Sequence, residues 1–413
     1  MLHRHSLAAT TERHVTRKKI LLQVSAGIPV AKGQTVVYNV PVQIAREAYM
    51  AVRLRVVLSA AVIAVLTGLI VSAQGGGRGA AAPSPYPTVS GKAYKFEKIA
   101  DGVYYATSTG ALATGSNNPV IVGDNEVMVV DTGTSPAAAR AMIDDLKVIT
   151  DKPVKYVVNT HFHYDHTDGN QVYAGRADII AHEYVKYAIE KLDVLHREPY
   201  KTSQLTNVPN RIDTLKKQIA GEQDEARKAT LQRQLATAEA GWEALKEIKP
   251  TPPNKTYSKK MTVKVGRHNV ELLFLGRGHT NGDTVVYLPQ ERIVCTGDLM
   301  ESALAYMGDA QFDEWVTTLE ALKKLEWDTD LPGHGTPFHD KGLVTAFQSY
   351  LTDITKQGAA LKQMGVSAED AAQRVDLTSH RTAFPSIQRP GADLRGMRRL
   401  YEWLDERSKN QGR

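Results

Sequence analysis

One short run in the sequence gathers the residue types that metal-dependent chemistry needs. It reads Thr160-His161-Phe162-His163-Tyr164-Asp165-His166. Three imidazoles and a carboxylate this close together do not form a packing core, because burying them without a cation leaves too many polar groups unsatisfied. His161 and His163 can converge on one ion, while Asp165 and His166 can turn towards a second. The run therefore predicts a metal site.

Three later positions offer further ligands, each after an apolar run. His279 follows Leu272-Leu-Phe-Leu275, Asp298 follows Arg292-Ile-Val-Cys295, and His334 lies in the glycine turn of Leu331-Pro-Gly-His-Gly335. Each is a weak signal alone, because a single His or Asp after a strand is more often a cap or a surface group. Their order along the chain, together with the histidine run, makes them candidate ligands of the same site.

The chain resembles the metallo-β-lactamase superfamily over about residues 92–336, apart from a helical segment that interrupts the match. All five motifs of that superfamily occur in order, at Asp131, Thr160 to His166, His279, Asp298 and His334. The resemblance implies an α/β fold of the αβ/βα four-layer sandwich type, with the metal site along one edge. Ordinary globular composition, 42% hydrophobic and 23% charged, is compatible with such a fold.

The resemblance also implies roles for these residues. One metal would be held by His161, His163 and His279, the other by Asp165, His166 and His334, and Asp298 would bridge them. Asp131 would support the ligands from a buried position without binding metal, and Asp165 would also orient the attacking hydroxide. Imidazole and carboxylate ligands favour two Zn²⁺ ions, with Fe or Mn as alternatives. Tyr164 either faces the substrate or packs beneath the loop.

These residues predict an enzyme, a metallo-hydrolase whose metal-bound hydroxide attacks an ester, lactone or amide bond of a small molecule. A β-lactamase is an alternative, although true β-lactamases of the superfamily usually carry Cys or Ser where this chain has Asp298. Glyoxalase II-like and lactonase-like branches have Asp there. A mono-iron persulfide dioxygenase, using His161, His279 and Asp298, is a second alternative. A binding protein with a vestigial metal site is a third, and no motif identifies substrate-binding residues.

The basic charge of the chain does not indicate a nucleic-acid partner. The net charge is +6, but residues 1–49 hold seven Lys/Arg against two Asp/Glu, and residues 50–73 add Arg53 and Arg55. The remaining residues carry 42 basic and 43 acidic side chains, a balance of −1. An electrostatic footprint for nucleic acid is therefore missing from the part expected to fold, and we expect a small-molecule substrate.

Residues 50–73 have the charged start, apolar middle and small-residue end of a signal peptide. We therefore expect residues 1–49 to be a start-site artefact or a disordered extension, and the protein to be periplasmic or secreted. The alternative is an uncleaved anchor that holds the chain to the membrane, facing the periplasm. The single cysteine, Cys295, excludes an intrachain disulfide and is expected to be a core thiol.

The Gly-, Ala- and Pro-rich residues 74–91 predict a flexible linker, followed by a catalytic domain over 92–340. Short apolar runs and an Ala-rich stretch capped by Ser135 predict strands alternating with helices. Residues of about 203–253 predict a helical insertion, either a hairpin turning between Gly221 and Glu225 or one helix with a phase break. It would act as a lid, a dimer contact or a solvated decoration. Residues 341–413 are expected to be helical.

Overall fold

The structure, a computed structural model, describes residues 85–411. The predicted signal or anchor over 50–73, the segment 1–49 and residues 74–84 of the predicted linker lie outside this range. In the described part, no helix combines the length and the apolar character needed to cross a bilayer. The last residues of the predicted linker are not linker, because Thr88–Ser90 pairs antiparallel with Lys95–Glu97 as an edge strand.

The first sheet has eight strands in sequence order. They are β1 (Thr88–Ser90), β2 (Tyr94–Ala100), β3 (Val103–Ser108), β4 (Asn118–Val122), β5 (Val127–Val130), β6 (Val154–Val158), β7 (Asp178–His182) and β8 (Lys255–Tyr257). Strands β1 to β5 are antiparallel neighbours, whereas β5 to β8 run parallel. Parallel neighbours need crossover connections, which the helices between them supply.

The second sheet has five strands in the order β13-β12-β11-β10-β9. They are β9 (Lys260–Val265), β10 (His268–Leu273), β11 (Val285–Leu288), β12 (Ile293–Gly297) and β13 (Thr329–Pro332). All pairings are antiparallel except β12 with β13, which is parallel. The carboxyl ends of β12 and β13 therefore lie at the same edge of this sheet, and each is followed by a candidate ligand.

The helices are α2 (Pro136–Asp145), α3 (Tyr164–Thr167), α4 (Asn170–Tyr173), α5 (Glu183–Lys191), α6 (Asn207–Gly221), α7 (Glu225–Leu245), α8 (Phe312–Lys324), α9 (Lys341–Gln363), α10 (Ala368–Arg374) and α11 (Leu394–Gln411). Short 3₁₀ turns lie at Leu146–Val148 and Thr378–His380, and a π-helical turn at Lys201–Thr206. Ser135 caps α2 as predicted, since its side chain accepts a hydrogen bond from the backbone N–H of Ala138.

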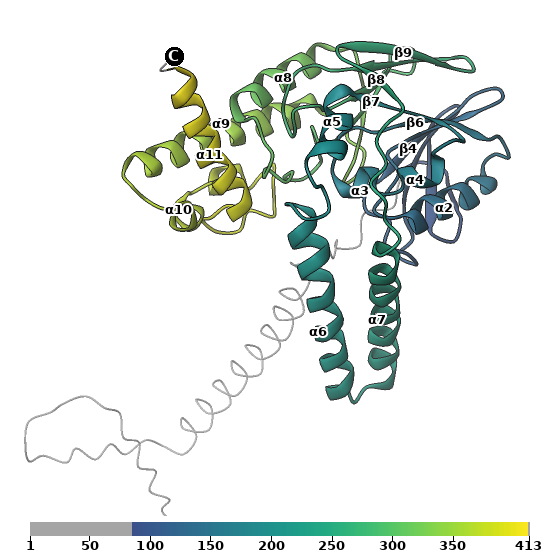
Figure 1. Ribbon diagram of the computed structural model, residues 1–413, viewed down its shortest axis with the longest axis horizontal. Helices are drawn as coiled ribbons and strands as arrows, with labels where there is room; N and C mark the ends of the chain where they lie inside the picture. Colours follow the sequence, from purple (N-terminus) through teal and green to yellow (C-terminus); the bar gives the residue numbers. More distant parts are fainter. Residues whose placement is uncertain (1–84, 412–413) are drawn as a thin grey trace, which may run out of the picture. The chain divides into compact units, whose positions relative to one another are not determined.

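The two sheets pack face to face, with helices on both outer faces (Figure 1). One apolar cluster between the sheets joins Met128 and Val158 of the first to Leu272 and Cys295 of the second. Another packs Met142 of α2 on the outer face of the first sheet. A third places α8 to α11 over the second sheet. These layers form the αβ/βα sandwich, and the terminal helices belong to its core.

The insertion between β7 and β8 is a helical hairpin. Helices α6 and α7 lie side by side and project from the sandwich as an arm (Figure 1). The turn between them spans residues 222–224, and Asp224 caps α7 by accepting from the backbone N–H of Arg227. The structure thus has the hairpin, not the single helix with a phase break. Ile212 and Leu215 are its buried residues on α6.

Candidate metal centre

The histidine run leaves the first sheet at the end of β6 and turns into the short helix α3. His163 precedes the first residue of α3 in extended conformation, while Asp165 and His166 lie in that helix. The backbone N–H of His166 donates to the carbonyl of His163 over 3.1 Å, which closes the turn. Side chains on both sides of this turn therefore face the edge where the two sheets meet.

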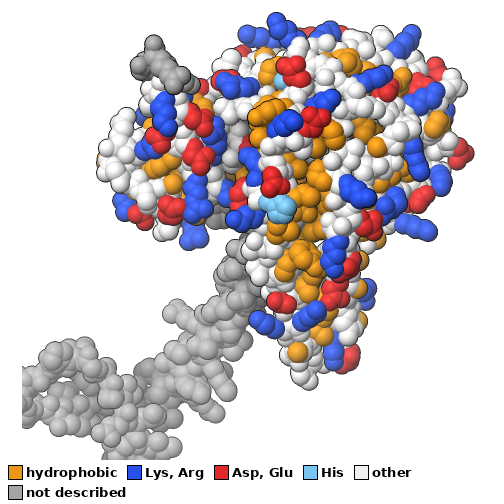
Figure 2. All heavy atoms as spheres, viewed as in Figure 1, with side chains coloured by type: hydrophobic (Ala, Val, Ile, Leu, Met, Phe, Trp, Pro, Cys, Tyr) orange, Lys and Arg blue, Asp and Glu red, His pale blue; other side chains and the backbone are white. Residues whose placement is uncertain are grey.

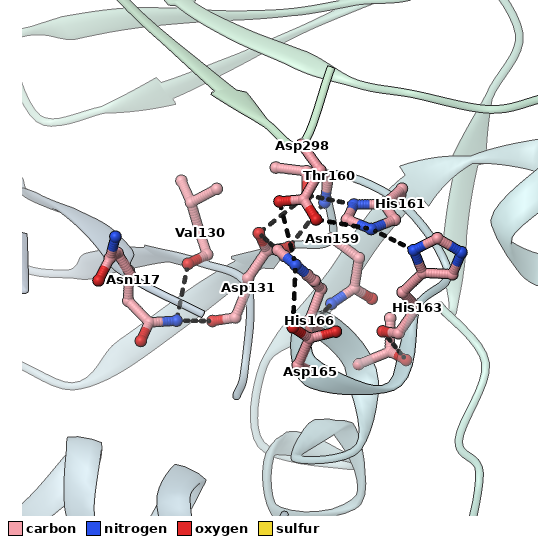
Figure 3. Close-up of polar contacts among 12 residues, drawn as sticks. Asn117, Val130, Asp131, Asn159, Thr160, His161, His163, Asp165, His166 and Asp298 are labelled. Atoms are coloured by element: carbon pink, nitrogen blue, oxygen red, sulfur yellow. Dashed lines mark hydrogen bonds and ion pairs between the residues drawn. The ribbon is translucent and has the colours of Figure 1, made fainter. Parts of the chain in front are cut away.

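The other candidates reach the same edge from the second sheet. His279 lies in the loop after β10, Asp298 directly follows β12, and His334 follows β13. All three positions come after strand ends, where a side chain can leave the sheet without disturbing its hydrogen-bond ladder. Figure 3 shows Asp298 approaching the histidine run from the strand above it. The predicted ligands are thus assembled from segments far apart in sequence.

The first group of ligand atoms comes from His161, His163, His279 and Asp298, all of them buried and within 4.8 Å of one another. Nδ1 of His163 lies 3.0 Å from Nε2 of His161 and 3.0 Å from Nε2 of His279. One imidazole nitrogen cannot satisfy both of these partners with a single proton. A cation at the centre would satisfy all of them at once, so the geometry fits a metal ion.

The second group comes from Asp165, His166 and His334, whose ligand atoms also lie within 4.8 Å of one another. Nε2 of His334 is 3.0 Å from Oδ2 of Asp165, and Nε2 of His166 is 3.8 Å from the same oxygen. The His334 side chain is 30% exposed and that of Asp165 15%, whereas His166 is fully buried. A substrate can therefore reach this group from the side of Asp165 and His334.

Asp298 lies between the two groups. Its Oδ2 is 3.8 Å from Nε2 of His161 and 3.7 Å from Nε2 of His279, both in the first group. Its Oδ1 is 3.3 Å from Nε2 of His166, which belongs to the second. A carboxylate in this position can join two cations held side by side. Within the described part of the chain, His166 Nε2 and Asp298 Oδ1 are buried without a hydrogen-bond partner, which a bound cation would also explain.

Asp131, at the end of β5, supports the metal-ligand side chains from a buried position. Its buried carboxylate accepts from Nδ1 of His166 over 2.7 Å, from the backbone N–H of Thr160 over 2.7 Å and from the Thr160 hydroxyl over 2.8 Å (Figure 3). Accepting from Nδ1 leaves Nε2 of His166 free to face the metal group. Asp131 has a φ of +62°, a left-handed conformation that Asp tolerates better than most residues.

Residues 113–334, more than half of the chain, match the family described as the metallo-beta-lactamase superfamily. The chain belongs to that superfamily. It is a superfamily of metal-dependent hydrolases, and the αβ/βα sandwich with its edge site is the fold expected from the sequence. The match ends at His334, so it includes all the predicted ligands and the helical hairpin.

Several curated relatives share parts of this superfamily domain. The alpha subunit of 2,4-dinitroanisole O-demethylase from Nocardioides sp. (strain JS1661) is 26% identical over 219 residues, 52% of this chain and 51% of the relative. A metallo-beta-lactamase type 2 from Bacillus sp. (strain 170) is 40% identical over 88 residues, 20% of this chain and 34% of the relative. A linear primary-alkylsulfatase from Pseudomonas sp. (strain ATCC 19151) is 22% identical over 289 residues, 67% of this chain and 53% of the relative.

The chain thus spans about half, or less, of the length of the curated relatives it matches. Among solved structures, a metallo-beta-lactamase from Pontibacter korlensis aligns with a TM-score of 0.45 and 19% identity, covering 63% of this chain and 99% of that one. The activities in these names are those of the relatives.

The protonation of the first group suits metal binding. Burial lowers the pKa of His279 to about 3, and the neighbouring His163 adds to this effect. Burial also lowers the pKa of His161 well below its usual range, assisted by His166. Both imidazoles are therefore neutral at pH 7, which is the state in which imidazole binds metal.

The protonation of the second group is different, because carboxylates surround its histidines. Burial lowers the pKa of His334, but Asp298 and Asp165 outweigh burial and raise it to about 9. For His166, burial is likewise outweighed by Asp298 and Asp131, which raise its pKa well above the usual value. Without a metal these imidazoles are protonated at pH 7, so a cation must displace their protons.

Two residues at the site carried no signal in the sequence. Asp309 lies in the loop before α8, and its Oδ2 is 3.0 Å from Nε2 of His163. Arg197, which precedes the hairpin, donates to the other carboxylate oxygen of Asp309 over 2.6 Å. Neither follows a strand or belongs to a superfamily motif, so only the fold reveals them. Tyr164 packs its ring at 5.4 Å from that of Tyr200, at the base of the hairpin.

Proposed function

We propose that the chain is an exported hydrolase that uses two divalent metal ions to cleave an ester, lactone or amide bond of a small molecule. The observation that carries this proposal is the pair of ligand groups that share Asp298. A single-metal enzyme would need only one of the groups. The buried atoms His166 Nε2 and Asp298 Oδ1, which lie 3.3 Å apart without a hydrogen bond, support the same conclusion.

The residues that would hold the metals are those of the two groups, with Asp298 contributing to both. When bound, divalent cations lower the pKa of water and polarise a carbonyl or phosphoryl oxygen. Zn²⁺ is the ion we propose first, because imidazole nitrogens dominate the ligand set, with Fe and Mn as alternatives. Asp131 fixes the tautomer and orientation of His166, and Asp309 does the same for His163.

Asp165 is the residue we assign to water orientation. Burial raises the pKa of its carboxyl group, but His166 and His334 outweigh burial and lower that pKa below its usual value. The ionised carboxylate can accept a hydrogen bond from a water molecule and take its proton as the bond to the substrate forms. Its partial exposure, 15%, leaves room for that water.

A β-lactam is the second candidate substrate, because the relative with 40% identity over 88 residues is a metallo-beta-lactamase. A sulfate ester is suggested by the linear primary-alkylsulfatase. Export to the periplasm, proposed from residues 50–73 alone, would place the enzyme where it meets β-lactams. Asp298 at the position where β-lactamases of the superfamily usually have Cys or Ser favours the broader ester, lactone and amide class.

The experiment compares zinc-loaded protein with His163→Ala on a chromogenic cephalosporin and on a panel of carboxylic esters, lactones and sulfate esters. The metal content of both proteins is measured after dialysis. Turnover that disappears in the variant would support the proposal and identify the substrate class. Stoichiometric loss of metal on dialysis would contradict it and favour a binding protein with a vestigial site.

A further inference from the structure

A cavity of about 680 Å³ lies where the α6–α7 hairpin meets the loop 109–117, and its size is typical of small-molecule sites. Apolar side chains form much of its wall, including Ala111, Leu112 and Ala113 from the loop and Val208, Ala238 and Leu245 from the hairpin. Figure 2 shows hydrophobic side chains gathered where the hairpin joins the body of the protein. Such a surface next to a reaction site calls for an apolar ligand.

The cavity adjoins the second group of metal ligands. Tyr164 and Gly115 line it, and a Cβ placed on Gly115 would lie 2.9 Å from the Cβ of Asp165. At its other end the same loop is tied to the turn that carries His334, because the backbone N–H of Asn117 donates to the carbonyl of Gly333 over 2.8 Å. The cavity thus adjoins the turn that carries Asp165 through Gly115 and Tyr164, and the loop that forms this wall continues to the turn that carries His334.

The charges of the wall restrict the ligand further. Among the described residues that line the cavity, the charged side chains are Arg211 and Arg233, both exposed. A cationic amphiphile would be repelled there, whereas a neutral or anionic one would not. The aliphatic stems of these arginines can also lie along an apolar chain while their guanidinium groups stay in water.

We infer that the substrate is an ester with an apolar chain, which occupies this cavity while its scissile bond lies at Asp165 and His334. This inference rests on the proposed hydrolase function and adds the substrate class to it. It also gives the hairpin a role, since α6 and α7 supply one wall of the cavity. The hydrolysis step is that of any ester: the oxygen of water adds to the ester carbonyl, and the bond to the leaving alkoxide breaks. One proton of the water passes to the alkoxide to give the alcohol, and the other is released to solvent as the acid leaves as its carboxylate.

The test measures kcat/KM of zinc-loaded, full-length protein for p-nitrophenyl acetate, butyrate, octanoate and decanoate. We expect kcat/KM to rise about two- to fourfold for each added methylene until the cavity is filled, as burial of a methylene group predicts. Ala238→Trp should remove this rise. The matched control is Ala240→Trp, because Ala240 lies on the same helix but is exposed and outside the cavity wall.

A second measurement separates this inference from the hydrolase function. Decanoate binding to metal-free protein is followed by calorimetry, and we expect wild type and Ala240→Trp to bind at least about tenfold more tightly than Ala238→Trp. If Ala238→Trp does not fold, Thr237→Trp, on the same wall, takes its place. Ester turnover without chain-length dependence would overturn the inference and leave the hydrolase standing. Decanoate binding that is lost in Ala238→Trp, without turnover of any ester, would show that the cavity binds an apolar chain but would contradict the hydrolase function, and the ester assignment with it.

Discussion

Nε2 of His163 lies 3.0 Å from Oδ2 of Asp309, on the side of the ring opposite the metal group. The carboxylate accepts a hydrogen bond from the Nε2–H group, which leaves Nδ1 as the nitrogen without a proton, aimed at His161 and His279. Arg197 fixes the carboxylate in turn. Because Arg197 belongs to the segment that enters the α6–α7 hairpin, the ligand geometry is tied to the insertion.

Replacing Asp309 by Asn should weaken metal binding. The amide carries no negative charge, so the imidazole of His163 becomes a poorer ligand, and we expect zinc affinity to fall by about 10- to 100-fold. Competition with a chromophoric chelator measures it. The control is Asp144→Asn, which removes an exposed partner of Lys147 far from the site chemistry. Equal affinity in the Asp309 variant and the control would contradict this role.

Asp165→Ala should lower turnover far more than stability. Loss of the water-orienting carboxylate is expected to reduce kcat/KM by about 10²- to 10⁴-fold, the range typical of general-base removal. Assays in excess zinc keep weaker metal binding from dominating the result, and urea unfolding reports stability. A variant that unfolds readily yet keeps its specific activity would remove Asp165 from the mechanism.

Gly297→Ala should disturb the site by crowding. Gly297 has a φ of +55°, and a Cβ there would overlap with the side chain of Thr160, whose hydroxyl is bonded to Asp131. Gly175→Ala is the matched control, because its φ is +72° but the space around it is open. We expect both to lose about 1–3 kcal/mol of unfolding free energy from backbone strain. Only Gly297→Ala should lose more than this and also bind less zinc.

Metal loading should depend on pH differently at the two groups. His279, with its pKa lowered to about 3, is already neutral above pH 5, so a cation there displaces no proton from it. His334, with its pKa raised to about 9, is protonated at pH 7 and must release its proton. Lowering the pH therefore weakens binding of the cation at the second group, by about tenfold per pH unit for each proton that the cation displaces.

Calorimetric titrations in buffers of different ionisation enthalpy count the protons released. We expect the second equivalent of zinc to release more protons than the first, and to be lost first as the pH falls from 8 to 6. Equal proton release for both equivalents would contradict the expected difference in histidine protonation between the two groups.

The sequence alone predicted several of the elements and the candidate metal ligands. The Ala-rich pattern predicted the capped helix that begins after Ser135, because such a helix depends on local periodicity and local hydrogen bonds. Motif order also selected the seven side chains that the structure brings into two groups. These features could be predicted because each belongs to a short segment with its own pattern.

Only the tertiary structure decided what surrounds those ligands. Asp309 and Arg197 reach His163 through a loop and the hairpin base, so their relationship is invisible to any local pattern. The choice of a hairpin over one long helix, and the cavity it forms with the loop 109–117, depend on packing between distant segments. Local propensity fixes elements and motifs, whereas burial and charge at a site arise from contacts that form only when the chain folds.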